Sequence, residues 1–149
     1  MKRKADANWE GTLKEGRGVT STPSGALRDT PYSFGTRFGD AEPGESQTNP
    51  EELIAAAAAS CFSMALSKAM GEAGISPVEI RTVAELDLNI TDSGPEWTAL
   101  HLHVEALEVD GLDVDKLTAL VADTEKGCPI YLLLAPGVKN SAVTSALVR

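Results

Sequence analysis

The sequence predicts an α+β protein, in which a mainly antiparallel sheet carries helices on one of its faces. The first reason is the order of the predicted elements along the chain, which runs β, α, β, α, β. The second is that short turns join neighbouring strands as hairpins, instead of the long crossovers that parallel sheets need. The chain has 149 residues, a length that suits one compact domain, so a single domain over residues 1–149 is expected.

The first 40 residues are typical of β structure. The segment "DANWEGTLKEGRGVTST" is expected to form two strands around a glycine-rich turn at Lys14–Gly18, and "PSG" at Pro23–Gly25 is a second turn. The segment "PYSFGTRF" is expected to be a short aromatic strand or loop. The polar stretch Gly39–Pro50 follows, and a loop of this length often carries function.

The segment "NPEELIAAAAASCFSMALSKAM" predicts a long central helix. Asn49 is a preferred N-cap, Pro50 suits the first helical position, and Glu52 lies where a capping-box carboxylate belongs. Gly74 is a natural stop, which gives a helix of about 24 residues and about 36 Å. A helix that is small and apolar on nearly every side belongs in an interior. A domain of this size has little volume to cover it, so a partner subunit is expected to help.

The second half of the chain predicts two further strands, two helices and a closing strand. Each is bounded by turn or cap residues. The elements are strands at 80–90 and 98–108 joined by "TDSGPE", an amphipathic helix from the cap Asp113 to Gly127, a short helix in "CPIYLLLA" with Cys128 as N-cap and Pro129 at its first position, and a strand in "SAVTSALVR".

Composition excludes several classes of function. The net charge is −9, which argues against a nucleic acid or an anionic membrane as partner, because phosphate binding needs a basic face. The N-terminus turns polar at once, unlike a secretory leader. No apolar run is expected to reach the roughly 20 residues that span a bilayer. We therefore expect a cytoplasmic protein.

Two cysteines and two histidines are the candidates for chemistry. Cys61 and Cys128 are too few for a disulfide framework or a four-cysteine zinc site, and a reducing cytosol keeps them as thiols. His101 and His103 alternate with apolar residues in "TALHLHVEAL", which predicts a half-buried strand with the imidazoles on its wetter face. For the two histidines, a position on the wetter face of a strand is favoured over a role as metal ligands.

Each candidate residue also has a structural explanation. Cys61 in an apolar helix is often a small core residue, and burial there would raise its pKa. Cys128 at a helix N-terminus would favour a thiolate, or simply cap the helix. Glu51 complements the helix dipole, and Arg37 suits a surface strand. Taken one at a time, none of these residues defines a site.

Together, the motifs resemble those of the OsmC/Ohr family, the osmotically inducible protein C and organic hydroperoxide resistance proteins. The similar segments are "PYSFGTRF", "NPEELIAAAAASCFSMAL" and "KGCP", and the likeness extends from Asn8–Gly11 to the C-terminal strand. The resemblance implies a fold in which mainly antiparallel sheets pack on two main helices, within an intertwined homodimer. It favours the OsmC branch, although "AAAAAS" stands where the family often has a bulkier side chain.

The resemblance also implies the site residues. Cys61 matches the peroxidatic cysteine, Cys128 the resolving cysteine and Glu51 the active-site carboxylate. Arg37 matches the arginine of the OsmC branch. In the Ohr branch the arginine lies earlier in the chain, and Arg17 and Arg28 are the candidates for it besides Arg3.

The implied activity is thiol-dependent reduction of organic hydroperoxides, and of hydrogen peroxide if small peroxides also enter, to alcohols. Cys61 becomes a sulfenic acid, Cys128 closes a disulfide on it, and an external dithiol reopens the disulfide. A lipoylated protein or a thioredoxin-like protein would supply that dithiol. Arg37 would stabilise the thiolate while Glu51 orients it through a bidentate ion pair. No metal, flavin or haem is needed.

Helix geometry adds an expectation about assembly. Glu51 and Cys61 are ten residues apart, so they lie about 15 Å apart along one helix and point about 80° apart around it. One arginine does not easily reach both in a straight helix. We therefore expect a homodimer with composite sites, in which Glu51 of one chain approaches Cys61 of the other.

Two other functions stay open at this point. A thiol oxidoreductase or thiol-dependent hydrolase would need a histidine base near Cys61. A dimeric stress or binding module without catalysis would have inert thiols too far apart to pair.

Overall fold

A computed structural model describes residues 1–39, 46–107 and 110–148. The chain divides into two compact units, Met1–Leu53 and Ile54–Arg149. The single domain expected over residues 1–149 stays a prediction. Half of the predicted loop at Gly39–Pro50, residues 40–45, lies outside the described residues.

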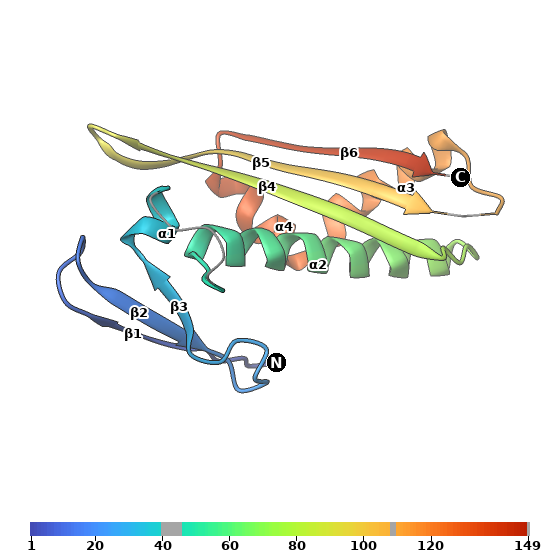
Figure 1. The fold of residues 1–149 in the computed structure, drawn as a ribbon. Helices are drawn as coiled ribbons and strands as arrows, with labels where there is room; N and C mark the ends of the chain where they lie inside the picture. The colour runs from blue at the N-terminus through green and yellow to red at the C-terminus, as the bar shows by residue number, and fades with distance from the viewer. Residues whose placement is uncertain (40–45, 108–109, 149) are drawn as a thin grey trace. The chain divides into compact units, whose positions relative to one another are not determined.

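The first unit contains an antiparallel sheet of three strands in the order β1-β2-β3 (Figure 1). The strands are β1 (Asp6–Glu10), β2 (Arg17–Ser21) and β3 (Thr30–Ser33). The predicted hairpin around the glycine-rich turn is confirmed, since β1 and β2 pair from Asp6↔Ser21 to Glu10↔Arg17. A Cβ on Gly18 would lie 2.3 Å from the Asn8 carbonyl oxygen and 2.6 Å from the Tyr32 ring, so this position has no room for a side chain.

The segment "PYSFGTRF" is half strand and half helix, which corrects the expected strand or loop. β3 ends at Ser33, and α1 (Phe34–Phe38) begins directly after it. Ser33 and Thr36 form a capping box, in which each side chain accepts a hydrogen bond from the backbone N–H of the other. These two bonds satisfy backbone groups that a strand would leave open at its end. Arg37 is therefore a helical residue in the last turn of α1.

The second unit contains a three-stranded sheet in the order β4-β5-β6, with its helices on one face (Figure 1). β4 (Glu79–Thr91) and β5 (Gly94–Leu107) form the expected hairpin, and β6 (Asn140–Val148) lies parallel to β5. The helical elements are α2 (Pro50–Glu72), whose first turn belongs to the first unit, α3 (Val114–Gly127), α4 (Pro129–Leu134) and the 3-10 turn η1 (Ala135–Gly137). This arrangement confirms the α+β class.

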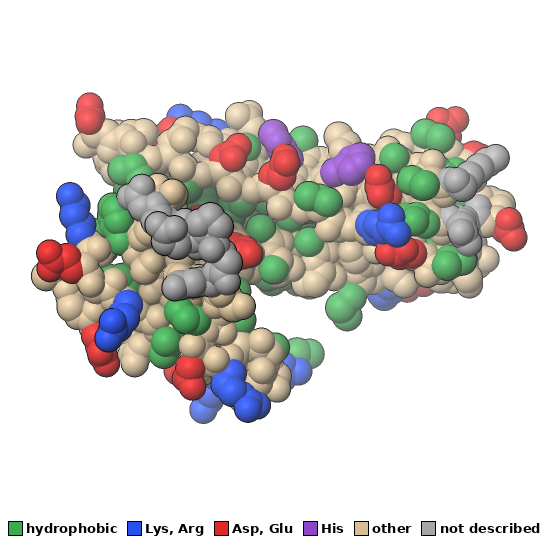
Figure 2. Space-filling view, in the orientation of Figure 1, with side chains coloured by type: hydrophobic (Ala, Val, Ile, Leu, Met, Phe, Trp, Pro, Cys, Tyr) green, Lys and Arg blue, Asp and Glu red, His purple; other side chains and the backbone are tan. Residues whose placement is uncertain are grey.

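Strand β5 shows which face of this sheet is inside. Leu100, Leu102, Val104 and Ala106 are buried, whereas His101 and His103 are exposed. Figure 2 shows the histidine side chains at the molecular surface. The predicted half-buried strand with imidazoles on its wetter face is confirmed.

Helix α2 begins and ends close to the predicted residues. The Asn49 Oδ1 atom accepts a hydrogen bond of 2.8 Å from the Glu52 backbone N–H, as an N-cap does. The Glu52 carboxylate accepts from the Thr48 hydroxyl at 3.0 Å, one residue earlier than the expected capping box. At the other end Gly74 has φ +72°, which only glycine adopts easily, and Ile75 N–H donates to the Met70 carbonyl.

Helix α2 is less covered than its composition suggests. Ala58, Phe62, Leu66 and Met70 form its buried face in the core of the second unit, but the side chain of Met64 is 75% exposed. Among the described residues, α2 is also the one helix that is long and apolar enough to cross a membrane by length and composition. The expectation that no apolar run approaches that length is therefore wrong. A helix that packs in the core of a folded protein passes the same test.

Candidate active site

The two cysteines lie side by side in the second unit. The Sγ atoms of Cys61 and Cys128 are 3.4 Å apart, and the geometry has Cys128 donating to Cys61. Cys128 is fully buried in the hydrophobic core, whereas Cys61 is partly exposed and packs against that core. Both are free thiols. The fold thus brings together two residues that are 67 positions apart in sequence.

Local sequence explains the placement of Cys128. It is the residue at which α3 ends and α4 begins, and its backbone N–H donates to the Thr124 carbonyl at 2.8 Å. Pro129 occupies the first position of α4, where its missing N–H costs no hydrogen bond. The sharp change of direction between two helices puts the Cys128 side chain into the core.

Of the two alternatives for Cys128, a thiolate favoured by the helix N-terminus is not supported by its surroundings. Burial raises the pKa of the Cys128 thiol, because the charged form would lose its hydration. The Tyr131 and Ile130 backbone N–H groups act in the opposite direction, and the neighbouring Cys61 raises the pKa further. Helix α4 has only six residues, so its dipole does not offset the desolvation. The buried Cys128 thiol therefore holds its proton more tightly than an ordinary cysteine, because its pKa is raised.

Arg37 and Glu51 form an ion pair in the first unit. The Arg37 Nε and Nη2 atoms donate to Glu51 Oε1 at 2.9 and 2.7 Å. The Asn49 side chain donates to the Thr36 carbonyl at 3.1 Å, which ties the start of α2 to α1. Because α1 carries Arg37 and the first turn of α2 carries Glu51, this hydrogen bond helps to hold the two charged residues next to each other.

The ion pair differs from the expected bidentate geometry. Both Arg37 donors converge on one oxygen of Glu51, since only that oxygen faces the guanidinium. The second oxygen, Oε2, is buried and has no hydrogen-bond partner among the described residues. A buried carboxylate oxygen that accepts no hydrogen bond lowers the stability of the folded state. The Arg37 side chain keeps 40% of its surface exposed.

The histidines do not take part in this site. The buried residues of β5 face the helices, so His101 and His103 point to the opposite face of the sheet from α2. His103 Nδ1 lies 2.9 Å from the Thr144 hydroxyl. The geometry therefore offers Cys61 no histidine base from this strand. Within residues 1–39, 46–107 and 110–148, no three His, Cys, Asp or Glu side chains gather as a metal site.

A hollow beside Arg37 contains residues that sequence reasoning did not assign. It has a volume of about 290 Å³ and includes four aromatic rings. Its lining residues are Trp9, Leu13, Tyr32, Ser33, Phe34, Arg37, Phe38 and Pro50. The Arg37 guanidinium lies 5.5 Å from the centre of the Phe38 ring. The aromatic content of "NWEG" and "PYSFGTRF" was the available signal.

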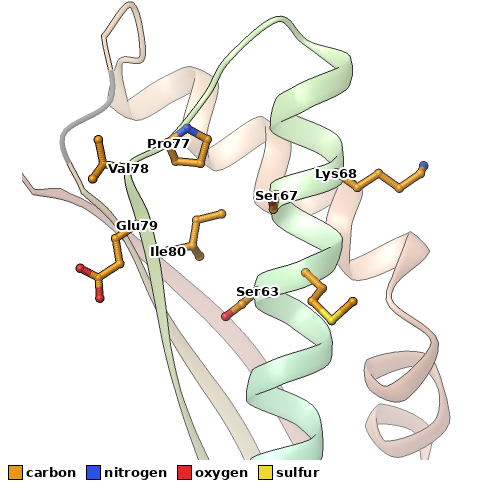
Figure 3. Close-up of a pocket in the computed structure, with 8 residues that line it drawn as sticks. Ser63, Ser67, Lys68, Pro77, Val78, Glu79 and Ile80 are labelled. Atoms are coloured by element: carbon orange, nitrogen blue, oxygen red, sulfur yellow. The ribbon is translucent and has the colours of Figure 1, made fainter.

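A second hollow, of about 540 Å³, lies between the C-terminal half of α2 and the start of β4 (Figure 3). Ser63, Met64, Ser67, Lys68, Pro77, Val78, Glu79 and Ile80 line it. None of these is a predicted site residue. Ser63 is also occupied by a hydrogen bond of 2.7 Å to the Thr82 hydroxyl, so we assign no chemistry to this hollow.

Comparisons with known proteins identify the class. Residues 42–142 match the family model described as OsmC-like protein. The chain is 45% identical over 132 residues to the peroxiredoxin OsmC of Escherichia coli (strain K12), with 89% of each chain covered. A peroxiredoxin OsmC of Shigella flexneri gives the same identity and coverage.

Solved structures agree on the fold. A crystal structure of an organic hydroperoxide resistance protein OsmC from Legionella pneumophila has a TM-score of 0.68 at 25% identity, covering 98% of this chain and 97% of the other. An OsmC-like protein from Mycoplasma pneumoniae has a TM-score of 0.74 at 14% identity, covering 100% and 99%.

A pair of thiols in contact, one partly exposed and one buried, is the arrangement expected of a thiol-based redox enzyme. The chain belongs to the OsmC-like protein family. The resemblance to OsmC read from the sequence and the expected enzyme class, a peroxidase, are confirmed. The individual roles of Cys61, Cys128, Arg37 and Glu51 stay predictions.

Proposed function

We propose that this protein reduces organic hydroperoxides to alcohols through a cycle of its two cysteines. The observation that carries the proposal is the 3.4 Å separation of the Cys61 and Cys128 sulfurs. A disulfide needs about 2.05 Å between sulfurs, so the thiols pair after a small movement. The difference in exposure supports the assignment of roles, because the peroxide must reach Cys61 and the resolving thiol needs no access to solvent.

The cycle has two chemical steps. The Cys61 thiolate attacks the distal oxygen of ROOH, the O–O bond breaks, and the departing alkoxide takes a proton and leaves as ROH. Cys61 is then a sulfenic acid. The sulfur of Cys128 attacks the Cys61 sulfur, a disulfide forms and water leaves with the hydroxyl oxygen and the Cys128 proton. Two electrons and two protons from an external dithiol restore both thiols.

Arg37 and Glu51 are proposed to act on the charge that this chemistry creates. A guanidinium stays protonated and is suited to stabilise both a thiolate and an oxygen that gains negative charge. The bonds to Glu51 Oε1 fix the orientation of the arginine. The orphan Oε2 atom supports the proposal that this carboxylate receives a further hydrogen bond in the complete site.

The complete site is proposed to form between two copies of the chain. Glu51 and Cys61 lie in the same straight helix, ten residues or about 15 Å apart. The largely uncovered surface of α2 supports a homodimer, because an apolar helix is stabilised when a second copy covers it. Light scattering coupled to gel filtration tests this proposal, and a fully active monomer contradicts it.

The proposed substrate and partner follow from the same chemistry. An apolar environment around Cys61 favours organic hydroperoxides, while small peroxides also fit. The proposed reductant is a dithiol, either a lipoyl group on a protein or a thioredoxin-like protein. The proposed compartment is the reducing cytoplasm, where both thiols rest reduced.

A single oxidation tests the function. Reduced protein is mixed with one equivalent of cumene hydroperoxide, and free thiols and intact mass are measured under denaturing conditions. We expect both thiols to disappear and the mass to fall by about 2 Da, the two hydrogens lost in one disulfide. The Cys128→Ser variant should instead gain one oxygen at Cys61, and the Cys61→Ser variant should not react. Survival of both thiols in excess peroxide contradicts the proposal.

A further inference from the structure

We propose that the external dithiol attacks Cys61, the same sulfur that meets the peroxide, and that Cys128 is the leaving thiol. The inference deepens the proposed function, because the Cys61–Cys128 disulfide is its starting point. A disulfide offers two sulfurs to an incoming thiolate, and which one is attacked depends on access and geometry. The two cysteines differ in burial, and this difference predicts which sulfur is attacked.

The two cysteines differ in their exposure to solvent. Cys128 is 0% exposed and belongs to the core cluster of the second unit. Cys61 is partly exposed on α2, with its neighbour Phe62 fully buried. A second copy of the chain does not expose a residue that is already fully buried. Access in the chain described here therefore favours Cys61.

Displacement at sulfur adds a directional requirement. The attacking, central and leaving sulfurs must be nearly in line, so the attacker approaches each sulfur from the side opposite its partner. Cys61 keeps part of its surface exposed, so an attacker from solvent has access to it, whereas Cys128 has no exposed surface. Cys128 belongs to the core cluster that also contains Phe62 and Tyr131, whose ring centroids are 5.9 Å apart. An attack on Cys128 would require this packing to open.

The exchange balances without another reactant. One thiolate of the dithiol bonds to the Cys61 sulfur, the Cys61–Cys128 bond breaks, and Cys128 leaves with the electron pair and takes up a proton. The second thiol of the reductant then attacks the reductant sulfur that is bonded to Cys61 in the mixed disulfide. Cys61 leaves as a thiolate, and the reductant departs as a cyclic or intramolecular disulfide. The protein thus returns with both cysteines reduced.

One consequence is that peroxide and reductant use the same entrance in turn. The reductant must therefore present its dithiol to the exposed part of Cys61 on α2. The buried Cys128 never bonds to a foreign molecule in the cycle. This property distinguishes the proposal from the alternative in which the resolving cysteine accepts the reductant.

Trapping with a monothiol tests the inference, because a monothiol performs only the first exchange. The disulfide is prepared in two parallel samples, one with cumene hydroperoxide and one with diamide. Each is treated briefly with excess 2-mercaptoethanol, quenched with acid, alkylated with N-ethylmaleimide and digested with trypsin. Cleavage after Arg37, Lys68, Lys126 and Lys139 separates the two cysteines into peptides 38–68 and 127–139.

We expect the mercaptoethanol adduct on peptide 38–68 and the maleimide on peptide 127–139, with a preference of about tenfold or more at the earliest times. In guanidinium chloride, where burial is lost, the two peptides should carry the adduct to a similar extent. An adduct mainly on 127–139, or an equal distribution in the native protein, overturns the inference. If only diamide forms the disulfide, the peroxidase proposal fails while the trapping still decides the site of attack. If neither oxidant forms it, both fail.

Discussion

The first turn of α2 and the turn that carries Cys61 belong to one helix but have opposite character. The first turn is polar: Glu51 bonds to Arg37, Glu52 bonds to Thr48, and Asn49 caps the helix. Around Cys61 the helix is apolar, and Phe62 is fully buried in the core. One helix thus carries a charged group at its start and a thiol about three turns later.

The difference shows that the thiol and the charged residues lie in separate parts of the same helix. A thiol tolerates an apolar wall, whereas an arginine and a glutamate need each other or water. Placing both in one turn would bury the charges in the core of a chain of 149 residues. Separating them along the helix leaves each region stable, and the proposed dimer then unites the two functions.

The largest expected effect concerns the apolar region. Phe62→Ala removes a fully buried ring that contacts Tyr131 edge to face, so the free energy of unfolding should fall by about 3–5 kcal/mol. Urea denaturation followed by circular dichroism measures it. The matched control on the same helix is Lys68→Ala, which removes an exposed ion pair with Glu72 and should cost less than about 0.5 kcal/mol. Equal effects would contradict the core role of Phe62.

The polar region is expected to affect catalysis more than stability. Arg37→Met removes the guanidinium but keeps a side chain of similar length, and kcat/KM for cumene hydroperoxide should fall by about 100-fold or more. Arg37→Lys should restore little of it, because an ammonium lacks the planar fork that two partners require. Steady-state turnover with a dithiol reductant measures both. Full recovery with lysine would contradict the proposed geometry.

Glu51→Gln is the graded control for the same region. An amide oxygen still accepts from Arg37 but carries no charge, so kcat/KM should fall by only about tenfold. A loss as large as that of Arg37→Met would mean that the carboxylate itself contacts the substrate. The orphan oxygen Oε2 makes this outcome informative.

The smallest effect is a pH dependence of stability that comes from Cys128. Burial holds its pKa above the ordinary value of about 8.5 for a free thiol. Below that pH both folded and unfolded chains keep the proton, and the stability from the neutral thiol is fully present. As pH rises, the unfolded chain loses its proton first, so the free energy of unfolding falls until pH passes the folded pKa.

Urea denaturation of the fully reduced protein between about pH 7.5 and 9.5 measures this loss, which cannot exceed about 1.4 kcal/mol for each pH unit. Cys128→Ala should lose less stability over the same range, because it has no thiol to titrate at that position. Identical slopes for the two proteins would contradict the burial argument.

The helices and strands could be predicted from the sequence where local signals were strong. Asn49 and Gly74 bounded α2, and Asp113 and Gly127 bounded α3, because caps act through neighbouring residues. The alternation around His101 gave the inner face of β5. The start of α1 also depends on a local signal, the Ser33–Thr36 capping box, but the aromatic residues around it favour a strand.

The site was less predictable, because its properties depend on distant contacts. Helix position alone suggested a thiolate at Cys128, but burial by other elements reverses the direction of its pKa shift. The contact between Cys61 and Cys128 joins residues 67 apart, and no local pattern fixes it. The one-sided geometry of the Arg37–Glu51 pair likewise depends on how α1 meets the start of α2.

A complementation experiment tests most directly whether the polar and sulfur regions act together across two copies. Arg37→Met and Cys61→Ser chains are unfolded together, refolded as an equal mixture and assayed for hydroperoxide reduction. If sites are composite, half of the dimers are mixed and each has one intact site, so the mixture should recover about a quarter of wild-type activity. A mixture with no more activity than the two variants assayed separately would contradict the account.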